Sequence, residues 1–167
     1  MLTAPQARAV MDDLCDILYD CVQDGASVGF MLPFDHDAAR PFWQGVVGAI
    51  EDGDMALITA EHQGRIVGTV LLGLKQPPNQ PHRADVKKLL VHRCARGLGL
   101  SRLLMTEVEQ QAKIARKNLL VLDTATGELA ESIYEKLGWS KAGIVPDYAL
   151  FPDGRFCDTT IFYKRVG

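Results

Sequence analysis

The sequence contains few cysteines, no metal-binding motif and no long apolar run. Its four cysteines form no Cys-x-x-Cys pair and no Cys/His cluster at zinc spacing, which excludes a zinc finger; they are Cys15, Cys21, Cys94 and Cys157. The four histidines also lack metal-ligand spacing and are interpreted as surface or turn residues; they are His36, His62, His82 and His92. No apolar run approaches the ~18 residues that a membrane span requires.

Charge excludes further classes. The formal net charge of −3 shows none of the basic excess typical of nucleic-acid binding, and the N-terminus lacks the order of a secretory signal. A length of 167 residues suits one domain with a substantial core. We therefore expect a single domain over residues 1–167, cytoplasmic with reduced thiols, that has neither nucleic acid nor a membrane as partner and holds no metal.

Hydrophobic spacing predicts four helices. Apolar residues at helical intervals place them over residues 6–23, 37–51, 100–115 and 130–137. Asp37 is the expected N-cap of the second helix. Gly138 suits the position just after the C-terminal end of the fourth helix.

Extended runs predict a sheet between and after these helices. Two runs at 55–61 and 65–74 form a hairpin, strands follow at 85–92 and 119–123, and a final hairpin joins 141–150 to 156–164. Segments 24–34 and 75–83 read as loops. A hairpin that feeds a strand–helix–strand crossover implies an α+β fold, in which helices flank a central mixed sheet.

The most informative stretch runs from Leu89 to Leu104, where an apolar strand meets a glycine-containing turn that opens directly into a helix. A helix start has unpaired N–H groups and the positive end of the helix dipole, and glycine lets a ligand approach them closely. Such a turn binds phosphate oxygens. The stretch from Arg96 to Ser101, with its two glycines, resembles the coenzyme A pyrophosphate turn of the GNAT superfamily of N-acetyltransferases.

The resemblance covers residues 55–164 with motifs in order. Three further segments resemble the tabtoxin-resistance acetyltransferase type; they are Gly25–Met31, Leu122–Thr124 and Pro152–Arg155. The family usually begins with a strand, for which Met1–Thr3 leaves almost no room. That strand is therefore very short or missing, or the true start lies upstream.

The resemblance implies acetyl-CoA as co-substrate. Backbone groups of Leu89, Leu90 and Val91 would bind its pantetheine arm and thioester carbonyl. Amides across the turn would bind its pyrophosphate; the residues are Arg96, Gly97, Leu98, Gly99, Leu100 and Ser101. Strict alternation fails where Lys87-Lys88 precedes three apolar residues, which predicts a bulge that exposes backbone donors. The alternative is a buried strand end.

Three residues are candidates for the chemistry. Asp85 lies where the family often carries a carboxylate, and Asp123 ends the next strand. A carboxylate is a weak base for an ammonium ion, so the expected role is to bind the amine and relay its proton. Tyr134 matches the tyrosine that faces the coenzyme A sulfur in relatives. Each has a structural alternative. Asp85 could be a solvated aspartate at a strand end, Asp123 a turn cap before Thr124, and Tyr134 a core residue.

The acceptor is less defined. Five residues lie in segments that border the acceptor cleft in relatives, with core or loop packing as the alternative; they are Phe30, Phe34, Trp43, Asp147 and Tyr148. We expect direct acetyl transfer to the primary amine of a small molecule, such as an amino-acid-like toxin or antibiotic. An open cleft between loop 24–34 and the last hairpin would favour a protein lysine or N-terminus instead. The third hypothesis is a non-catalytic protein that binds acyl-CoA. The oligomeric state is undetermined, with a homodimer as one option.

Overall fold

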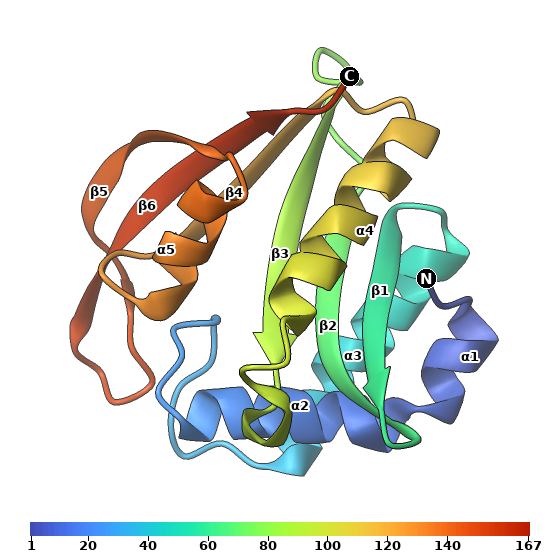
Figure 1. The fold of residues 1–167 in the computed structure, drawn as a ribbon. Helices are drawn as coiled ribbons and strands as arrows, with labels where there is room; N and C mark the ends of the chain where they lie inside the picture. The colour runs from blue at the N-terminus through green and yellow to red at the C-terminus, as the bar shows by residue number, and fades with distance from the viewer.

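A six-stranded mixed sheet forms the centre of the molecule in the computed structural model, which describes residues 1–167 (Figure 1). The strand order is β1-β2-β3-β4-β6-β5. Only β3 and β4 pair in parallel; the other neighbours are antiparallel. The strands are β1 (Met55–His62), β2 (Arg65–Gly73), β3 (Arg83–Val91), β4 (Leu119–Ala125), β5 (Ser140–Leu150) and β6 (Phe156–Arg165). The predicted mixed sheet is confirmed.

Helices cover both faces of this sheet. One core joins α1 (Ala4–Ala9), α2 (Met11–Gln23) and α3 (His36–Glu51) to one face, through side chains such as Leu57 and Leu71. The other core joins α4 (Leu100–Ile114) to the opposite face, through Ile58, Val70 and Leu72, and includes Tyr134 of α5 (Leu129–Lys136). Because successive side chains of a strand point to opposite faces of the sheet, the same strands contribute apolar side chains to both cores. No helix is both long enough and apolar enough to cross a membrane.

The N-terminal region differs from the prediction in three details. The single helix expected over 6–23 is two helices, because Val10, at φ −110° and ψ 21°, leaves helical geometry. The N-cap of α3 is Asp35 rather than Asp37, since its carboxylate accepts from the N–H of Ala38 at 2.8 Å. The strand expected before the first helix is reduced to one bridge, in which Leu2 N–H donates to Leu57 O at 2.9 Å.

The predicted bulge in β3 is confirmed. The pairing passes from Thr69↔Leu90 to Leu71↔Lys87, so β3 carries one extra residue opposite β2. Lys88 takes the left-handed conformation at φ 52°. The bulge changes the alternation: Val86 faces the α4 core, whereas Leu90 faces the α1–α3 core.

Strands β3 and β4 separate soon after they pair. Their parallel register covers three pairs, from Arg83↔Leu119 to Asp85↔Val121. Beyond Asp85, the edge of β3 that faces β4 has no strand partner. The sheet therefore opens between its two central strands, and the carboxyl ends of both strands border the opening.

Candidate active site

The turn before α4 presents a row of free backbone donors. A short 3-10 helix, η1 (Arg93–Ala95), follows β3, and the chain then passes through Gly97 at φ 81° and Gly99 at φ 75°. The five amides from Gly97 to Ser101 donate to no acceptor in the protein. Since both glycines adopt the left-handed conformation, residues with a Cβ would be strained there. The predicted pyrophosphate turn has the conformation and the donors to bind an anion.

Carboxylates at the C-terminal end of α2, Asp20 within the helix and Asp24 just after it, anchor this turn, a feature that the sequence analysis missed. The buried Asp20 accepts from Arg93 N–H at 2.9 Å and from Arg93 Nε at 2.7 Å. Asp24 pairs with Arg96 Nη1 at 2.5 Å, and this hydrogen bond lowers the pKa of Asp24. Arg96 Nε also donates to Val91 O at 3.3 Å. The side chain of Arg96 thus holds the turn together, and its charge is already paired.

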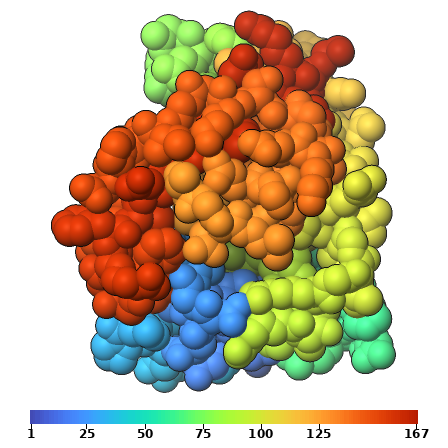
Figure 2. Space-filling model, turned by 60° about the vertical axis from the view of Figure 1, so that its left-hand side comes forward, coloured from blue at the N-terminus to red at the C-terminus, as the bar shows by residue number.

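Asp85 and Asp123 line one cavity of about 230 Å³ in the opening of the sheet, together with Tyr148. Gln76 Nε2 donates to Asp85 Oδ2 at 3.1 Å, and Arg83 lies 3.6 Å from the same oxygen. Asp123 is exposed and has no hydrogen-bond or ion-pair partner in the protein. Figure 2 shows a hollow on this face, where the surfaces of α5 (orange), loop 24–34 (blue) and the phosphate turn (yellow-green) meet.

Tyr134 lies on the other side of this opening, on α5. Its ring packs against Trp139 and Phe162, with centroids 6.0 and 5.7 Å away. Burial raises the pKa of its hydroxyl, and the nearby charge of Asp123 raises it further. The phenol therefore stays protonated, and its hydroxyl makes no hydrogen bond within the protein. It is available as a hydrogen-bond donor.

Lys88 is a second feature that the sequence analysis did not identify. Its Nζ donates to Val28 O in loop 24–34 at 2.6 Å. Burial lowers the pKa of this ammonium, while the charge of Asp123 opposes that shift. The left-handed bulge thus directs a desolvated cation into the region of the predicted acceptor cleft.

Loop 24–34 is also joined to the β5–β6 hairpin. Ser27 Oγ donates to Leu150 O at 2.8 Å, and Leu32 N–H donates to Pro152 O at 3.0 Å. Two segments more than one hundred residues apart in sequence therefore meet above the opening of the sheet.

The other predicted acceptor residues occupy different places. Phe30 packs against Phe34 and Phe42 at centroid distances of 4.9 and 5.5 Å. Phe34 and Trp43 are buried in the α1–α3 core and do not line the cavity. Asp147 is exposed in the left-handed conformation at φ 51°, and its N–H donates to Asp158 Oδ1 at 2.9 Å. Only Tyr148 among these five residues lines the cavity.

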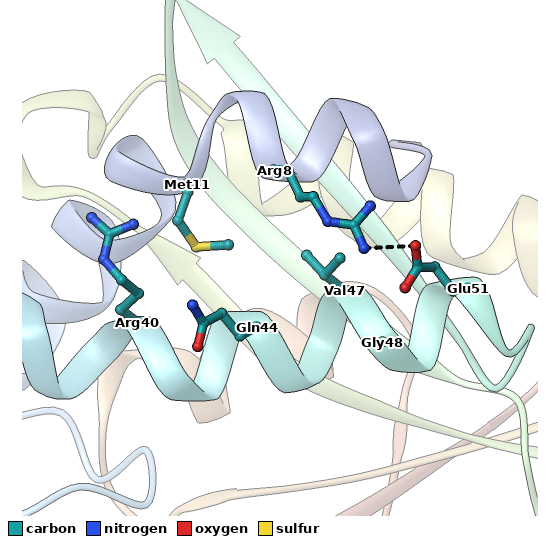
Figure 3. A pocket seen from close by; sticks show the side chains of 7 residues that line it. All are labelled: Arg8, Met11, Arg40, Gln44, Val47, Gly48 and Glu51. Carbon is teal, nitrogen blue, oxygen red and sulfur yellow. Dashed lines mark hydrogen bonds and ion pairs between the residues drawn. The ribbon is translucent and has the colours of Figure 1, made fainter.

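A wider hollow of about 400 Å³ lies elsewhere, between α3 and the junction of α1 with α2 (Figure 3). Its two arginines are already paired: Arg8 with Glu51 at 2.6 Å and Arg40 with Asp12 at 2.7 Å. None of the predicted site residues lines it. We therefore place the acceptor site in the smaller cavity, which is lined by both predicted carboxylates and by Tyr148. The structure contains no group of three or more histidine, cysteine or acidic side chains arranged for a metal ion.

Comparison with known proteins identifies the family of this chain. Residues 22–145 match the family model described as "Acetyltransferase (GNAT) domain". An uncharacterized N-acetyltransferase of Azospirillum brasilense is 30% identical over 115 residues, which cover 68% of this chain and 67% of that protein. N-acetyltransferase 8B of Rattus norvegicus is 31% identical over 129 residues, which cover 68% of this chain and 58% of that protein.

Solved structures show the same fold. The ribosomal-protein-alanine N-acetyltransferase of Brucella melitensis superposes with a TM-score of 0.80 at 21% identity, over 98% of this chain and 96% of the other. A structure from Salmonella typhimurium that holds acetyl-CoA gives a TM-score of 0.78 at 17% identity, over 99% and 91%. Since the family model spans most of the chain, this protein belongs to the GNAT family of acetyltransferases.

Proposed function

We propose that this chain transfers the acetyl group of acetyl-CoA to the primary amine of a small molecule, such as an amino-acid-like toxin or antibiotic. One observation carries the choice of acceptor. The hydrogen bonds of Ser27 to Leu150 and of Leu32 to Pro152 close loop 24–34 against the β5–β6 hairpin. A protein segment would need an open channel at this place, whereas a small amine fits the cavity of about 230 Å³.

The residues present fit acetyl-CoA. The free amides from Gly97 to Ser101 suit its pyrophosphate, and the unpaired edge of β3 over Leu89–Val91 suits its pantetheine amides. When bound, acetyl-CoA supplies an activated acetyl thioester with a thiol leaving group. The edge amides of β3 would also stabilise negative charge that develops on the thioester oxygen.

The two carboxylates would handle the amine. Asp123 has no partner within the protein and is free to bind a cationic amine, while Asp85 is held by Gln76 on the same cavity. The amine must lose a proton before it attacks, and either carboxylate can receive that proton directly or through water. Tyr134 would donate a hydrogen bond to the leaving sulfur. Full proton transfer from the phenol is unnecessary for this role, and the raised pKa of Tyr134 opposes it.

Two measurements test the proposal. Thermal unfolding with and without acetyl-CoA tests the turn, because a ligand at 100 times its Kd adds about 2.7 kcal/mol of stability. Thiol release is then followed with a panel of small amines, amino acids and lysine- or alanine-terminated peptides. We expect an upward shift, and turnover with small amines that falls in Asp123→Asn and Asp85→Asn.

The outcomes of these measurements distinguish the three functional hypotheses. Turnover with peptides alone would replace the small acceptor by a protein, and a thermal shift without turnover on any amine would favour an acyl-CoA-binding protein. No shift at millimolar acetyl-CoA would refute the proposal as a whole. The cytoplasmic location expected from the cysteine usage remains a prediction.

A further inference from the structure

Cys94 is the exposed cysteine of this chain; Cys15, Cys21 and Cys157 are buried. It lies on η1, two residues before Arg96 and outside the cavity that holds the two carboxylates. Its Sγ is 2.9 Å from Nδ1 of His92. A thiol and an imidazole nitrogen at this distance form a nucleophile–base pair.

The hydrogen bonds around His92 determine which ring nitrogen is the base. The backbone N–H of Cys94 donates to Nδ1 at 3.2 Å, so Nδ1 is an acceptor and the ring proton is on Nε2. Nε2 lies 3.6 Å from Asp20 Oδ1 and 3.7 Å from Asp16 Oδ2. The unprotonated nitrogen therefore faces the thiol, and two carboxylates lie on the side that would carry the charge of an imidazolium.

The charged groups around the Cys94–His92 pair are fixed in place by ion pairs of their own. Asp20 binds Arg93 at 2.7 Å, and Arg93 also lies 3.7 Å from Asp24. The carboxylate of Asp16 accepts one hydrogen bond from His36 of α3 and one from Arg65 of β2, each at 3.2 Å. Burial alone would raise the pKa of Asp16, but these hydrogen bonds and the nearby His92 outweigh it and lower that pKa. Asp16 is therefore ionised at neutral pH, and its carboxylate lies 3.7 Å from Nε2 of His92.

We propose that Cys94 is a site of thiol–disulfide exchange with small disulfides, and that His92 takes up its proton. The thiol proton passes to His92 Nδ1, which gives up the hydrogen bond from the backbone N–H of Cys94, as Sγ attacks one sulfur of the reagent R–S–S–R. The reagent's S–S bond breaks, and a Cys94–S–S–R bond forms. The departing R–S⁻ is reduced and recovers the proton from His92, while Cys94 is oxidised. This reaction does not depend on acetyl transfer.

The arrangement favours uncharged disulfides. Arg93 and Arg96 flank Cys94 in sequence, but Arg93 is paired with Asp20 of α2 and Arg96 with Asp24 just after α2, so neither presents an unpaired charge to an anionic reagent. Once attached, the new group stands beside the turn whose amides are free. The site thus places a covalent modification next to the proposed phosphate-binding residues.

The test uses the full chain and the uncharged reagent 4,4′-dithiodipyridine, whose released thiopyridone is followed by absorbance. At about pH 7 we expect one fast equivalent in the native protein, assigned to Cys94 by intact mass and peptide mapping. Cys94→Ser should remove it. His92→Gln should slow it by about tenfold or more, because the assisting base is lost. His62→Gln, at an exposed histidine of β1, is the matched control and should react like the parent chain.

The pH dependence separates proton transfer from simple exposure. Near about pH 9.5 a free thiol is ionised without help, so the difference between His92→Gln and the parent chain should close. Equal rates for folded His92→Gln and the parent chain at pH 7 would overturn the proposal. If His92→Gln does not fold, the test uses the parent chain only, and compares the reaction rate of Cys94 in the native protein with its rate in guanidinium. A native rate that is no faster would overturn the proposal.

Discussion

Lys88 Nζ donates a 2.6 Å hydrogen bond to the carbonyl oxygen of Val28, which ties the bulge of β3 to loop 24–34. The same ammonium lies 5.8 Å from the ring centroid of Phe30 and 5.5 Å from that of Phe42. A desolvated cation gains from both kinds of contact. Lys88 therefore holds loop 24–34 from the sheet, in addition to the hydrogen bonds that Ser27 and Leu32 make with the β5–β6 hairpin.

We predict that Lys88→Met raises the KM for the acceptor amine and lowers stability, while the affinity for acetyl-CoA stays the same. A hydrogen bond to a charged group contributes about 1.5–3 kcal/mol, so a loss of that order is expected in chemical unfolding. Lys113→Met is the matched control, because its side chain is exposed on α4, makes no hydrogen bond or ion pair and lies outside the cavity. Equal acceptor KM values for the two variants would show that Lys88 does not position the loop.

Tyr134→Phe keeps the ring that packs on Trp139 and Phe162 but removes the hydroxyl. We expect kcat to fall by about a hundredfold, because the hydrogen bond to the leaving sulfur is lost. Unfolding and the acetyl-CoA thermal shift should stay close to those of the parent chain. Tyr163→Phe, at a half-exposed tyrosine of β6, should leave kcat unchanged. Normal turnover of Tyr134→Phe would remove this residue from the mechanism.

Local sequence signals were sufficient for the sheet, for most of the helices and for the glycine turn that opens α4. Lys87-Lys88 broke the alternation of a strand, and the structure has its bulge there. The break at Val10 could not be predicted in the same way, because apolar spacing continues across it while the backbone leaves helical geometry. Both Asp35 and Asp37 could cap α3, and the choice of Asp35 follows from the conformation of the preceding loop.

Long-range pairs account for what the sequence analysis missed. Asp20 is buried at a helical position among apolar residues, yet its partner Arg93 lies 73 residues away. An acidic residue on the apolar face of a predicted helix was the available signal, and only the fold supplies its partner. Lys88 has the same explanation: the bulge was predicted, but the contact with Val28 depends on how loop 24–34 crosses the sheet.

Gly99 tests whether the left-handed turn is required for cofactor binding. An added Cβ would meet no atom within 4 Å, so the cost of Gly99→Ala comes from the backbone at φ 75°. That strain amounts to about 1–2 kcal/mol, and relaxation of the turn would misalign the amides from Gly97 to Ser101. We expect a smaller acetyl-CoA thermal shift. Gly45→Ala, equally unobstructed but inside helix α3, should stabilise the chain by about 0.5–1 kcal/mol and leave the thermal shift intact.

Glu131 ties α5 to its surroundings and should make stability depend on pH. Its carboxylate accepts from Gly127 N–H at 2.6 Å and from Lys141 and Thr160 at 2.9 Å each. The hydrogen bond from Gly127, followed by that from Lys141, lowers the pKa of Glu131. Because the folded pKa lies below the unfolded value of about 4.3, this stabilisation is complete above that value and is lost as pH falls through the folded pKa.

Glu131→Gln should therefore unfold at lower temperature than the parent chain at neutral pH, and the difference should shrink as the pH falls below about 4. Gln can still accept from Gly127 but carries no charge for Lys141, so we expect a neutral-pH loss of about 1 kcal/mol. Glu135→Gln, at an exposed position of α5 that makes no hydrogen bond or ion pair, is the control and should show no such pH trend. A Tm difference for Glu131→Gln that stays constant from neutral to acidic pH would mean that ionisation of Glu131 contributes nothing to the stability of the folded chain.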